Sequence, residues 1–472
     1  MPTLRVYDHL RRQLVDFVPV HPGKVGMYVC GLTPQDRPHV GHMRSFVAGD
    51  VMRRYLEYCG YDVTYVQNFT DIDDRIITKA NDEGVDYTVV AARNIEAYFR
   101  ASDALHIRRA TVYPYATQHI PEILDLISKL ISSGHAYAAG GDVFYAVESF
   151  AGYGKLSGKK LDELRAGSRI EIDEDKRNPL DFVLWKGAKP GEPSWETPWG
   201  PGRPGWHIEC SAMAMKYLGT TLDLHGGGED LFFPHHENEI AQSEAATGQE
   251  FCRHWVEARF VNLSGEKMSK STGHFVPVED VVKDYDPEAL RLYVIATHYR
   301  TAIEFAWERV SETSVGLARL HAVLKLAREA EAAGATAGAT AGSGGGALDA
   351  EIAATRDAFH VAMCDDFNTP RAVASLYDLS RIANRAATAG HSGALVKAAT
   401  ELRACGALLG LFWNERADDT FDAAILALAD QREAARQVKE WATADALRAQ
   451  LAERGVIVED KRPSGYQLKR KG

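Results

Sequence analysis

VGMYVC, residues 25–30, opens the stretch that decides the fold. Its apolar run indicates a short buried strand, MRSFVAGDVMRRYLEYCG at 43–60 has the apolar spacing of an amphipathic helix, and VTYVQNFT at 63–70 indicates a second strand. A strand, a helix and a strand within about 45 residues form the building block of a parallel sheet. Because ligands of such sheets bind beyond the carboxyl ends of the strands, Cys30 and Thr70 lie where a site is expected.

The composition is typical of a multidomain chain from a reducing compartment. With 472 residues and 45% hydrophobic content, the chain is long enough for about three or four domains. Its six cysteines are too sparse for a disulfide framework, no apolar run is long enough to cross a membrane, and the N-terminus lacks the apolar core of a signal peptide. We therefore expect a cytoplasmic protein without membrane contact. The net charge of -11 argues against a general polyanion binder, although a local basic face remains compatible with it.

The remaining sequence indicates an insertion, a helical part and a small C-terminal domain. Alternating apolar positions in GGDVFYAV and a loop crowded with Gly, Pro and Trp mark the insertion. EAAGATAGATAGSGGGA at 331–347 is expected to be a flexible connection, helical periodicity continues to residue 454, and GVIVED and GYQLKR indicate a hairpin. We expect these divisions: a parallel-sheet domain at 1–115 and 205–255, the insertion at 116–204, a loop-bearing region at 256–310, a helical bundle at 311–420 and a C-terminal domain at 421–472.

FPHHENE at 233–239 has the composition of a metal site. Read as a helix, it places His235 and Glu239 four residues apart on one face, which is ligand spacing. A zinc centre needs three or four protein donors, and Cys30 and Cys210 complete four because both lie at loop-like positions. A single cysteine is more often a small core hydrophobe, and we keep that interpretation for the other four: Cys59, Cys252, Cys364 and Cys405. His236 is expected to point about 100° away from His235.

Two further motifs are suited to phosphate. In PHVGH at 38–42, His39 and His42 flank Gly41 at the start of the first helix, where free backbone amides and the missing side chain allow close approach of a nucleotide. In EKMSKS at 266–271, Lys267 and Lys270 lie on a loop that can bring two ammonium groups onto a polyphosphate. The alternatives, a turn with two surface histidines and a solvated charged loop, stay open for each motif alone.

Together the motifs resemble those of class I aminoacyl-tRNA synthetases. HVGH at 39–42 resembles the first signature of that class and KMSKS at 267–271 matches the second, in the same order and about 225 residues apart. YVCGLT, NFTDIDDRI, GRPGWHIECSAM, DLHGGGEDLFFPHHENEIAQS and DDFNTP make the resemblance specific to the cysteinyl-tRNA synthetase family, over nearly the whole chain. The resemblance implies an α/β fold: a Rossmann-type doubly wound parallel sheet with an inserted connective domain, an α-helical bundle and a small α+β anticodon-binding domain.

The same resemblance implies a two-step reaction. L-cysteine and ATP, accompanied by Mg²⁺, give cysteinyl-adenylate and pyrophosphate, and the cysteinyl group then passes to the 3′-terminal adenosine of tRNA(Cys). The family's zinc ligands fall on Cys30, Cys210, His235 and Glu239, the four residues that the spacing also selects. A single zinc ion per chain would bind the substrate thiolate and reject serine, which a hydrophobic pocket discriminates poorly. No segment large enough for an editing domain is expected.

Residue roles follow from the matching positions. The resemblance places the catalytic groups at His39, His42, Lys267 and Lys270, the ATP contacts at His39, Gly41, His42, Asp230 and Lys270, and the cysteine pocket at Cys30, Thr70 and Trp206. A helix N-cap is an equally open interpretation of Asp230, and a core aromatic one of Trp206. Gln35, Val40, Thr272 and His274 depart from the usual family pattern, so ATP contacts and loop dynamics are open at those positions.

The C-terminal domain has a local basic character with an aromatic residue that can stack on a base. Its expected tRNA residues are Arg436, Trp441, Asp445 and Asp460, although a solvated amphipathic helix pair explains the charges equally well. We expect a monomer. Two other functions stay open: a ligase that joins cysteine to a small amine, which would lack a full anticodon-binding end, and a non-catalytic zinc-containing RNA-binding or redox-sensing paralogue, which would not need intact HVGH and KMSKS motifs.

Overall fold

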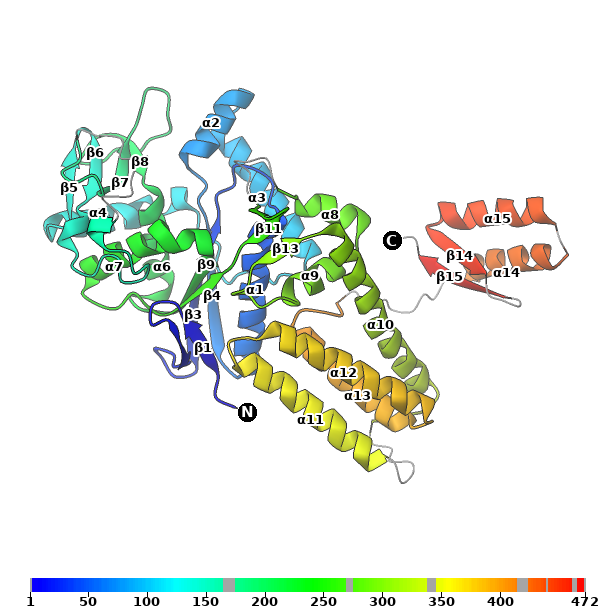
Figure 1. Ribbon diagram of the computed structural model, residues 1–472. Coiled ribbons are helices and arrows are strands. Elements are labelled where there is room, and N and C mark those ends of the chain that lie inside the picture. Colours follow the sequence, from blue (N-terminus) through cyan, green and yellow to red (C-terminus); the bar gives the residue numbers. More distant parts are fainter. Residues whose placement is uncertain are drawn as a thin grey trace. The chain divides into compact units, whose positions relative to one another are not determined.

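The computed structural model describes residues 2–163, 175–268, 275–337, 345–413, 423–438, 440–460 and 465–470. Contacts within the chain define two compact units, Met1–Phe412 and Trp413–Gly472, which are described separately here (Figure 1). Within the described part of the chain, none of the helices combines the length and the apolar character that crossing a bilayer requires.

The centre of the first unit is a parallel sheet with the strand order β10-β9-β3-β4. Its strands are β3 (Lys24–Leu32), β4 (Asp62–Phe69), β9 (Leu222–Gly228) and β10 (Cys252–Ala258). β3 pairs in parallel with β4, and α1 (Val40–Tyr58) connects them, so the predicted strand, helix and strand are confirmed. The chain then crosses to the other side of β3 to form β9. This reversal makes the carboxyl ends of β3 and β9 the expected ligand-binding edge.

Helices cover both faces of this sheet. α1 contacts all four strands, and α6 (Trp206–Leu218) contacts β3, β4 and β9. Figure 1 shows the two helices on opposite sides of the strands. Because both faces are covered, β3 and β4 are buried almost continuously along their lengths, as expected for parallel strands of an α/β protein. The predicted α/β class and doubly wound sheet are confirmed.

A second, antiparallel sheet lies between the two halves of the parallel sheet in the sequence. It has the order β5-β6-β7-β8 and packs with α4 (Ile120–Ser132). Its strands are β5 (Ala136–Ala139), β6 (Asp142–Tyr145), β7 (Phe182–Gly187) and β8 (Gly202–Pro204). Its core includes Ile208 of α6 and Ala241 of α7 (Glu237–Thr247), so this sheet shares apolar contacts with the helices that carry the site.

A third, small sheet carries the start of the KMSKS motif. β11 (Val261–Leu263) pairs antiparallel with β12 (Glu266–Lys267) and parallel with β13 (Ile303–Phe305). α8 (Val278–Asp284) and α9 (Pro287–Ile295) lie between β12 and β13 in the sequence. The first unit also contains β1 (Arg5–Asp8), β2 (Gln13–Asp16), α2 (Asp74–Glu83), α3 (Tyr87–Ala104) and the short turns η1 (Ala116–Gln118), η2 (Val147–Ser149), η3 (Glu229–Leu231) and η4 (Phe232–His236).

The helical part of the first unit is a bundle. Its helices are α10 (Trp307–Ala332), α11 (Gly345–Cys364), α12 (Thr369–Thr388) and α13 (Ser392–Leu408). Residues 338–344 of the predicted flexible connection lie outside the described residues. The second unit contains α14 (Ala423–Gln437), α15 (Trp441–Glu453), β14 (Val456–Asp460) and β15 (Tyr466–Arg470). β14 and β15 pair antiparallel, which confirms the predicted hairpin.

Candidate active site and metal centre

A cavity of about 780 Å³ opens at the carboxyl ends of β3 and β9. It brings together most of the predicted site residues: Cys30, His39, Gly41, His42, Thr70, Trp206, Cys210, Asp230, His235 and Lys267. Gln35, a departure from the family pattern, also lines it. Glu239 is fully buried beside the cavity, whereas Lys270, Thr272 and His274 lie outside the described residues.

Four of these side chains form a compact set of metal donors. The Sγ atoms of Cys30 and Cys210 are 3.9 Å apart, Cys30 Sγ lies 3.5 Å from Glu239 Oε1, and His235 Nε2 lies 3.1 Å from the same oxygen. One donor atom from each residue lies within 4.8 Å of the others, and all four residues are buried. Two thiols, an imidazole and a carboxylate at such distances are a donor set that fits a divalent metal ion such as zinc.

The local structure around these donors differs from the prediction in two ways. Cys30 and Cys210 are not in loops, because Cys30 lies inside β3 and Cys210 lies in α6, which already begins at Trp206. The stretch 233–239 is not one helix, because Phe233 has extended backbone angles (φ -141°, ψ 130°) and α7 begins at Glu237. His235 and Glu239 nevertheless lie close together, as their spacing predicts, although the helix begins later than predicted.

The charges of the donor set are strongly coupled. Burial raises the pKa of the Cys30 thiol well above its ordinary value, and the hydrogen bond from Cys30 lowers the pKa of Cys210 to about 6. Burial opposes ionisation of Glu239, but the charges of His225 and His235 hold the pKa of Glu239 well below its ordinary value. Burial lowers the pKa of His235, but the charges of Glu239 and Cys210 raise it to about 10. Ionised Cys210 and Glu239 are therefore favoured, whereas Cys30 and His235 keep protons that binding of a divalent cation would displace.

Neighbouring histidines orient the donors. His225 Nε2 lies 2.9 Å from Glu239 Oε2, and His207 Nδ1 lies 2.9 Å from His235 Nδ1, so the other nitrogen of His235 is left facing Glu239. Such partners of metal ligands fix their orientation and basicity. Sequence reasoning assigned no partner to His207 or His225, since their contacts depend on the three-dimensional arrangement.

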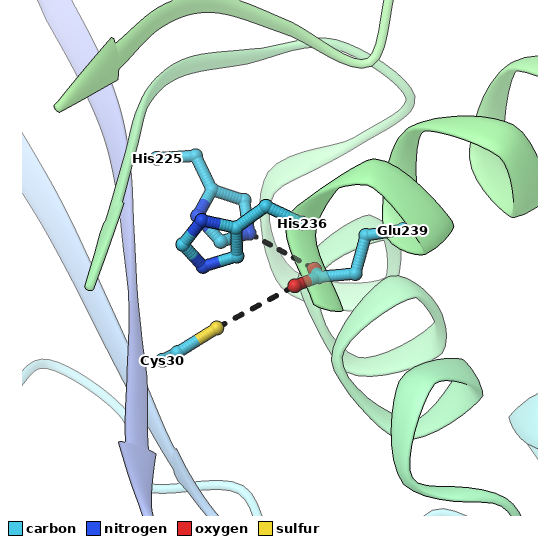
Figure 2. Close-up of side chains that lie close together, drawn as sticks. All are labelled: Cys30, His225, His236 and Glu239. Atoms are coloured by element: carbon cyan, nitrogen blue, oxygen red, sulfur yellow. Dashed lines mark hydrogen bonds and ion pairs between the residues drawn. The ribbon is translucent and has the colours of Figure 1, made fainter. Parts of the chain in front are cut away.

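Cys30, His225, His236 and Glu239 make a second close grouping (Figure 2). His236 belongs to this grouping and His235 to the first, and the Nδ1 atom of His236 lies 2.6 Å from Glu257 Oε1. Burial raises the pKa of Glu257 to about 8. The sequence missed Glu257, and the only available signal was an acidic residue near the carboxyl end of the strand CRHWVEA.

The HVGH motif forms the N-terminus of α1. His39 is the N-cap residue, its Nδ1 accepts a hydrogen bond from the His42 amide at 3.2 Å, and the two rings stack with their centroids 3.6 Å apart. A Cβ atom on Gly41 would lie 2.9 Å from the His39 ring, so a side chain at this position would displace that ring. Gly41 lines the cavity at this helix N-terminus, a position suited to phosphate, whereas the amides of His39 and His42 are bonded to each other's imidazoles.

Lys267 and Asp230 also line the cavity. Lys267 Nζ lies 3.3 Å from Asp230 Oδ2 and 4.2 Å from the centroid of the Phe260 ring. Asp230 lies inside the turn η3, whose N-cap residue is Gly228, so the N-cap interpretation of Asp230 is wrong. Trp206 is partly exposed to the cavity and stacks on His235 with centroids 4.5 Å apart, which excludes the alternative of a core aromatic. Thr70 Oγ1 accepts a hydrogen bond from Asn68, which also lines the cavity.

The second unit holds the residues predicted to contact tRNA. Trp441 begins α15 and is 58% exposed, and Asp445 is exposed on the same helix. Arg436 near the end of α14 pairs with Glu433 at 3.0 Å, and Asp460 is the last residue of β14. The side chains of Trp441 and Asp445 are thus accessible to a partner.

Family comparisons agree with this arrangement. Residues 16–315 match the family described as tRNA synthetases class I (C) catalytic domain, residues 358–413 match a DALR domain, and residues 418–466 match the cysteinyl-tRNA ligase anticodon binding domain. A solved Mycobacterium tuberculosis methionyl-tRNA synthetase bound by methionyl-adenylate aligns with 82% of this chain and 91% of its own length, at a TM-score of 0.63 and 16% identity. At that identity the likeness shows a shared fold.

Curated relatives are similar over their full lengths. A Moorella thermoacetica protein named "Cysteine--tRNA ligase" is 49% identical over 98% of this chain and 99% of its own. A Syntrophobacter fumaroxidans protein of the same name is 45% identical over 98% of both chains. Matches of this extent cover the catalytic part and the C-terminal unit together. The chain therefore belongs to the cysteine--tRNA ligase family of class I tRNA synthetases.

Proposed function

We propose that the chain activates L-cysteine with ATP and transfers it to tRNA(Cys). The observation that best supports this reaction is the common cavity: the Cys30, Cys210 and His235 side chains line one wall, and the HVGH turn and Lys267 line others. An amino acid held at the donor set thus has its carboxylate directed to the phosphate side. Attack of that carboxylate on the α-phosphorus gives cysteinyl-adenylate and releases pyrophosphate.

We assign the donor set to one Zn²⁺ ion. Zinc bound there would hold the substrate sulfur as a thiolate. Because serine carries a hydroxyl in place of the thiol, the zinc would select cysteine against serine. Cys30, Cys210, His235 and Glu239 hold the ion, His207 and His225 orient His235 and Glu239, and Trp206 and Thr70 close the amino-acid side of the cavity. With selectivity of this kind, a separate editing activity is unnecessary.

The phosphate side is assigned to the two signature motifs. Gly41 presents its backbone, and His39 and His42 their imidazoles, to the phosphates of ATP, which Mg²⁺ accompanies, and Asp230 lies on the nucleotide side. Lys267 and Lys270 neutralise the departing pyrophosphate. The Lys267–Asp230 pair at 3.3 Å gives Lys267 a resting partner that a nucleotide phosphate can replace.

The remaining parts are assigned to tRNA. We propose the divisions given above as functional domains, with residues 116–204 as the connective domain at the acceptor end, 256–310 as the stem-contact region and 421–472 as the anticodon-binding domain. Arg436, Trp441, Asp445 and Asp460 are the proposed tRNA contacts. We further propose that the protein acts in the cytoplasm as a monomer.

The test is transfer of labelled cysteine to unfractionated tRNA by the purified chain, with ATP, magnesium and a parallel reaction with serine. Charging with cysteine but not serine is the expected result. Cysteine-dependent exchange of pyrophosphate into ATP without tRNA charging would instead favour a ligase that joins cysteine to a small amine. Absence of both reactions in a zinc-loaded preparation would favour a non-catalytic paralogue.

A further inference from the structure

A buried arginine, Arg44, connects the HVGH helix to the sheet that carries Lys267. It lies two residues after His42 on α1 and is 1% exposed. Its Nη1 donates to the carbonyl of Phe260 at 2.7 Å, and its Nη2 donates to the carbonyls of His298 at 3.0 Å, Tyr299 at 3.3 Å and Thr301. No carboxylate pairs with this guanidinium among the described residues, so four carbonyl oxygens from two chain segments receive its charge.

Asp366 holds the segment 298–301 from the bundle side. Its Oδ1 accepts hydrogen bonds from the Tyr299 hydroxyl at 2.6 Å and the Tyr7 amide at 2.8 Å, and its Oδ2 lies 2.6 Å from Arg300 Nε. Asp366 and Phe367 have positive φ angles of 61° and 49°, a conformation that non-glycine residues adopt at a cost. This is the DDFNTP motif, for which the proposed reaction otherwise gives no role.

The segment held by these two residues continues into β13, which lies beside the hairpin of β11 and β12, called here the KMSKS hairpin. The Arg259 amide donates to the Tyr299 carbonyl at 2.8 Å, the Ile303 amide donates to the Phe260 carbonyl at 3.0 Å, and β13 then pairs with β11. β11 pairs in turn with β12, which ends at Lys267. The ring of Phe260, whose carbonyl Arg44 binds, lies under the Lys267 ammonium.

We propose that Arg44 and Asp366 are positioning residues that set the place of the KMSKS hairpin relative to the HVGH helix. Neither lies at the phosphate itself, so both act through the hairpin. Burial keeps water away from the Arg44 guanidinium and lowers its pKa to about 10. A lysine keeps the charge at this position, but its compact ammonium replaces the planar guanidinium fork whose two Nη atoms reach the Phe260 carbonyl and the carbonyls of residues 298–301 separately.

The kinetic test of this inference rests on the proposed function, whereas the hydrogen-exchange test does not. The variants are Arg44→Lys and Asp366→Asn. The matched control for the first variant is Arg54→Lys, because Arg54 is a buried arginine of the same helix that bonds the His106 carbonyl instead of the hairpin. The matched control for the second is Asp365→Asn, because Asp365 is the neighbouring carboxylate and pairs with Arg5 and Arg371. Rapid-quench kinetics give the rate of adenylate formation and, separately, the rate of cysteinyl transfer from enzyme-bound adenylate.

Each positioning variant should slow adenylate formation by about 10- to 100-fold, because a small misplacement of a catalytic group has an effect of that size. Transfer to tRNA should change less than about threefold, since pyrophosphate has left by then. In each positioning variant, the zinc content and the KM for cysteine should equal those of the wild type. Both control variants should have wild-type rates of adenylate formation and of transfer. Equal slowing of both steps would overturn the proposal, because that result describes general destabilisation.

Hydrogen exchange tests the positioning without any reaction. Peptides covering residues 260–268 and 299–305 should exchange at least about tenfold faster in Arg44→Lys and Asp366→Asn than in the wild type, with β3 and β9 unchanged. Unchanged exchange at the hairpin would overturn the proposal even if the protein proves to be fully active. Absence of activity in the wild type, with faster exchange in the variants, would instead overturn only the proposed function.

Discussion

Asp50 of α1 and Arg291 of α9 form a fully buried ion pair, with Oδ2 and Nη2 2.5 Å apart. Arg54 shares the same carboxylate at 2.8 Å. Arg291 also donates to the carbonyls of Leu409 at 2.8 Å and Leu105 at 2.8 Å. The pair therefore joins the HVGH helix to the end of the bundle.

Arg291→Leu should destabilise the first unit by about 3–5 kcal/mol, because it leaves a buried carboxylate with less compensation and several buried carbonyls without donors. The measurement is urea unfolding followed by fluorescence of the buried Trp185 and Trp255, both in the first unit. Arg108→Ala, which removes the partly exposed pair with Glu57, is the control and should cost at most about 1 kcal/mol. Similar losses for both variants would show that burial of the Asp50 pair is irrelevant to stability.

The same carboxylate gives a pH dependence whose sign is fixed. Burial alone would raise the pKa of Asp50, but Arg291 and Arg54 lower it below its ordinary value. An acid with a lowered folded pKa contributes stability above its unfolded pKa of about 3.9 and loses it as the pH falls through the folded value. The difference in unfolding free energy between the wild type and Asp50→Asn should thus be constant from pH 7 to about 5 and shrink below pH 4. A difference that grows on acidification would contradict the ion pair.

The sequence predicts the parts of this protein that depend on local pattern. Hydrophobic periodicity locates β3, α1 and β4, and the spacing of His235 and Glu239 selects two metal donors before any fold is known. The helix starts at Trp206 and Glu237 were misplaced, since a turn with non-helical Phe233 leaves no periodic signal in so short a segment.

Interactions between distant segments could not be predicted, because a local sequence pattern does not reveal which segments meet in the fold. Arg44 reads as one polar position on an amphipathic helix, yet its carbonyl partners lie more than 200 residues away. The pairing of His236 with Glu257 depends on the register of β10 beside β9, which the sequence does not reveal. Such contacts decide how the signature motifs are placed, whereas the motifs themselves are visible in the sequence.

Cys210→Ser should lose zinc and the preference for cysteine together. A serine hydroxyl is a poor zinc ligand beside the Cys30 thiol, so zinc per chain should fall well below one and cysteine-dependent ATP–pyrophosphate exchange should fall by more than about 100-fold. Zinc content is measured by atomic absorption alongside exchange with cysteine and serine. Extended chelation of the wild type should have the same effect, and added zinc should reverse it.

Cys252→Ser is the control for this substitution. Cys252 is equally buried, but its Sγ contacts the His254 carbonyl and belongs to neither donor group. Its variant should keep both zinc and selectivity. A Cys210→Ser protein that retained one zinc and rejected serine as before would refute the metal assignment.

Lys270→Ala should slow adenylate formation by about 100-fold or more, since removal of one preorganised charge from a transition state has effects of that order. Lys267→Ala should have a smaller effect, because its ammonium also rests against Asp230 and Phe260. Single-turnover adenylate formation is the measurement. Lys283→Ala removes an exposed lysine on α8 and should leave the rate unchanged. Normal adenylate formation by Lys270→Ala would remove the assigned role of the loop.

Trp441→Ala should weaken tRNA binding through loss of base stacking. The Trp441 side chain is 58% exposed at the start of α15, so its removal leaves no cavity in the core of the second unit. Stacking of a base on an aromatic ring contributes about 1–3 kcal/mol, and the affinity for tRNA measured by filter binding should fall accordingly. Leu426→Ala, an exposed apolar residue of the same unit, is the control and should bind normally.

Salt titrations of the same variants separate stacking from charge. The slope of log affinity against log salt should be unchanged in Trp441→Ala, because no phosphate contact is lost. Arg436→Ala should reduce that slope by about 1 if its guanidinium meets a phosphate. A change of slope in Trp441→Ala, or binding equal to that of Leu426→Ala, would mean that the exposed tryptophan contacts no base. The helix pair of α14 and α15 would then be a solvated surface, as its sequence alone allows.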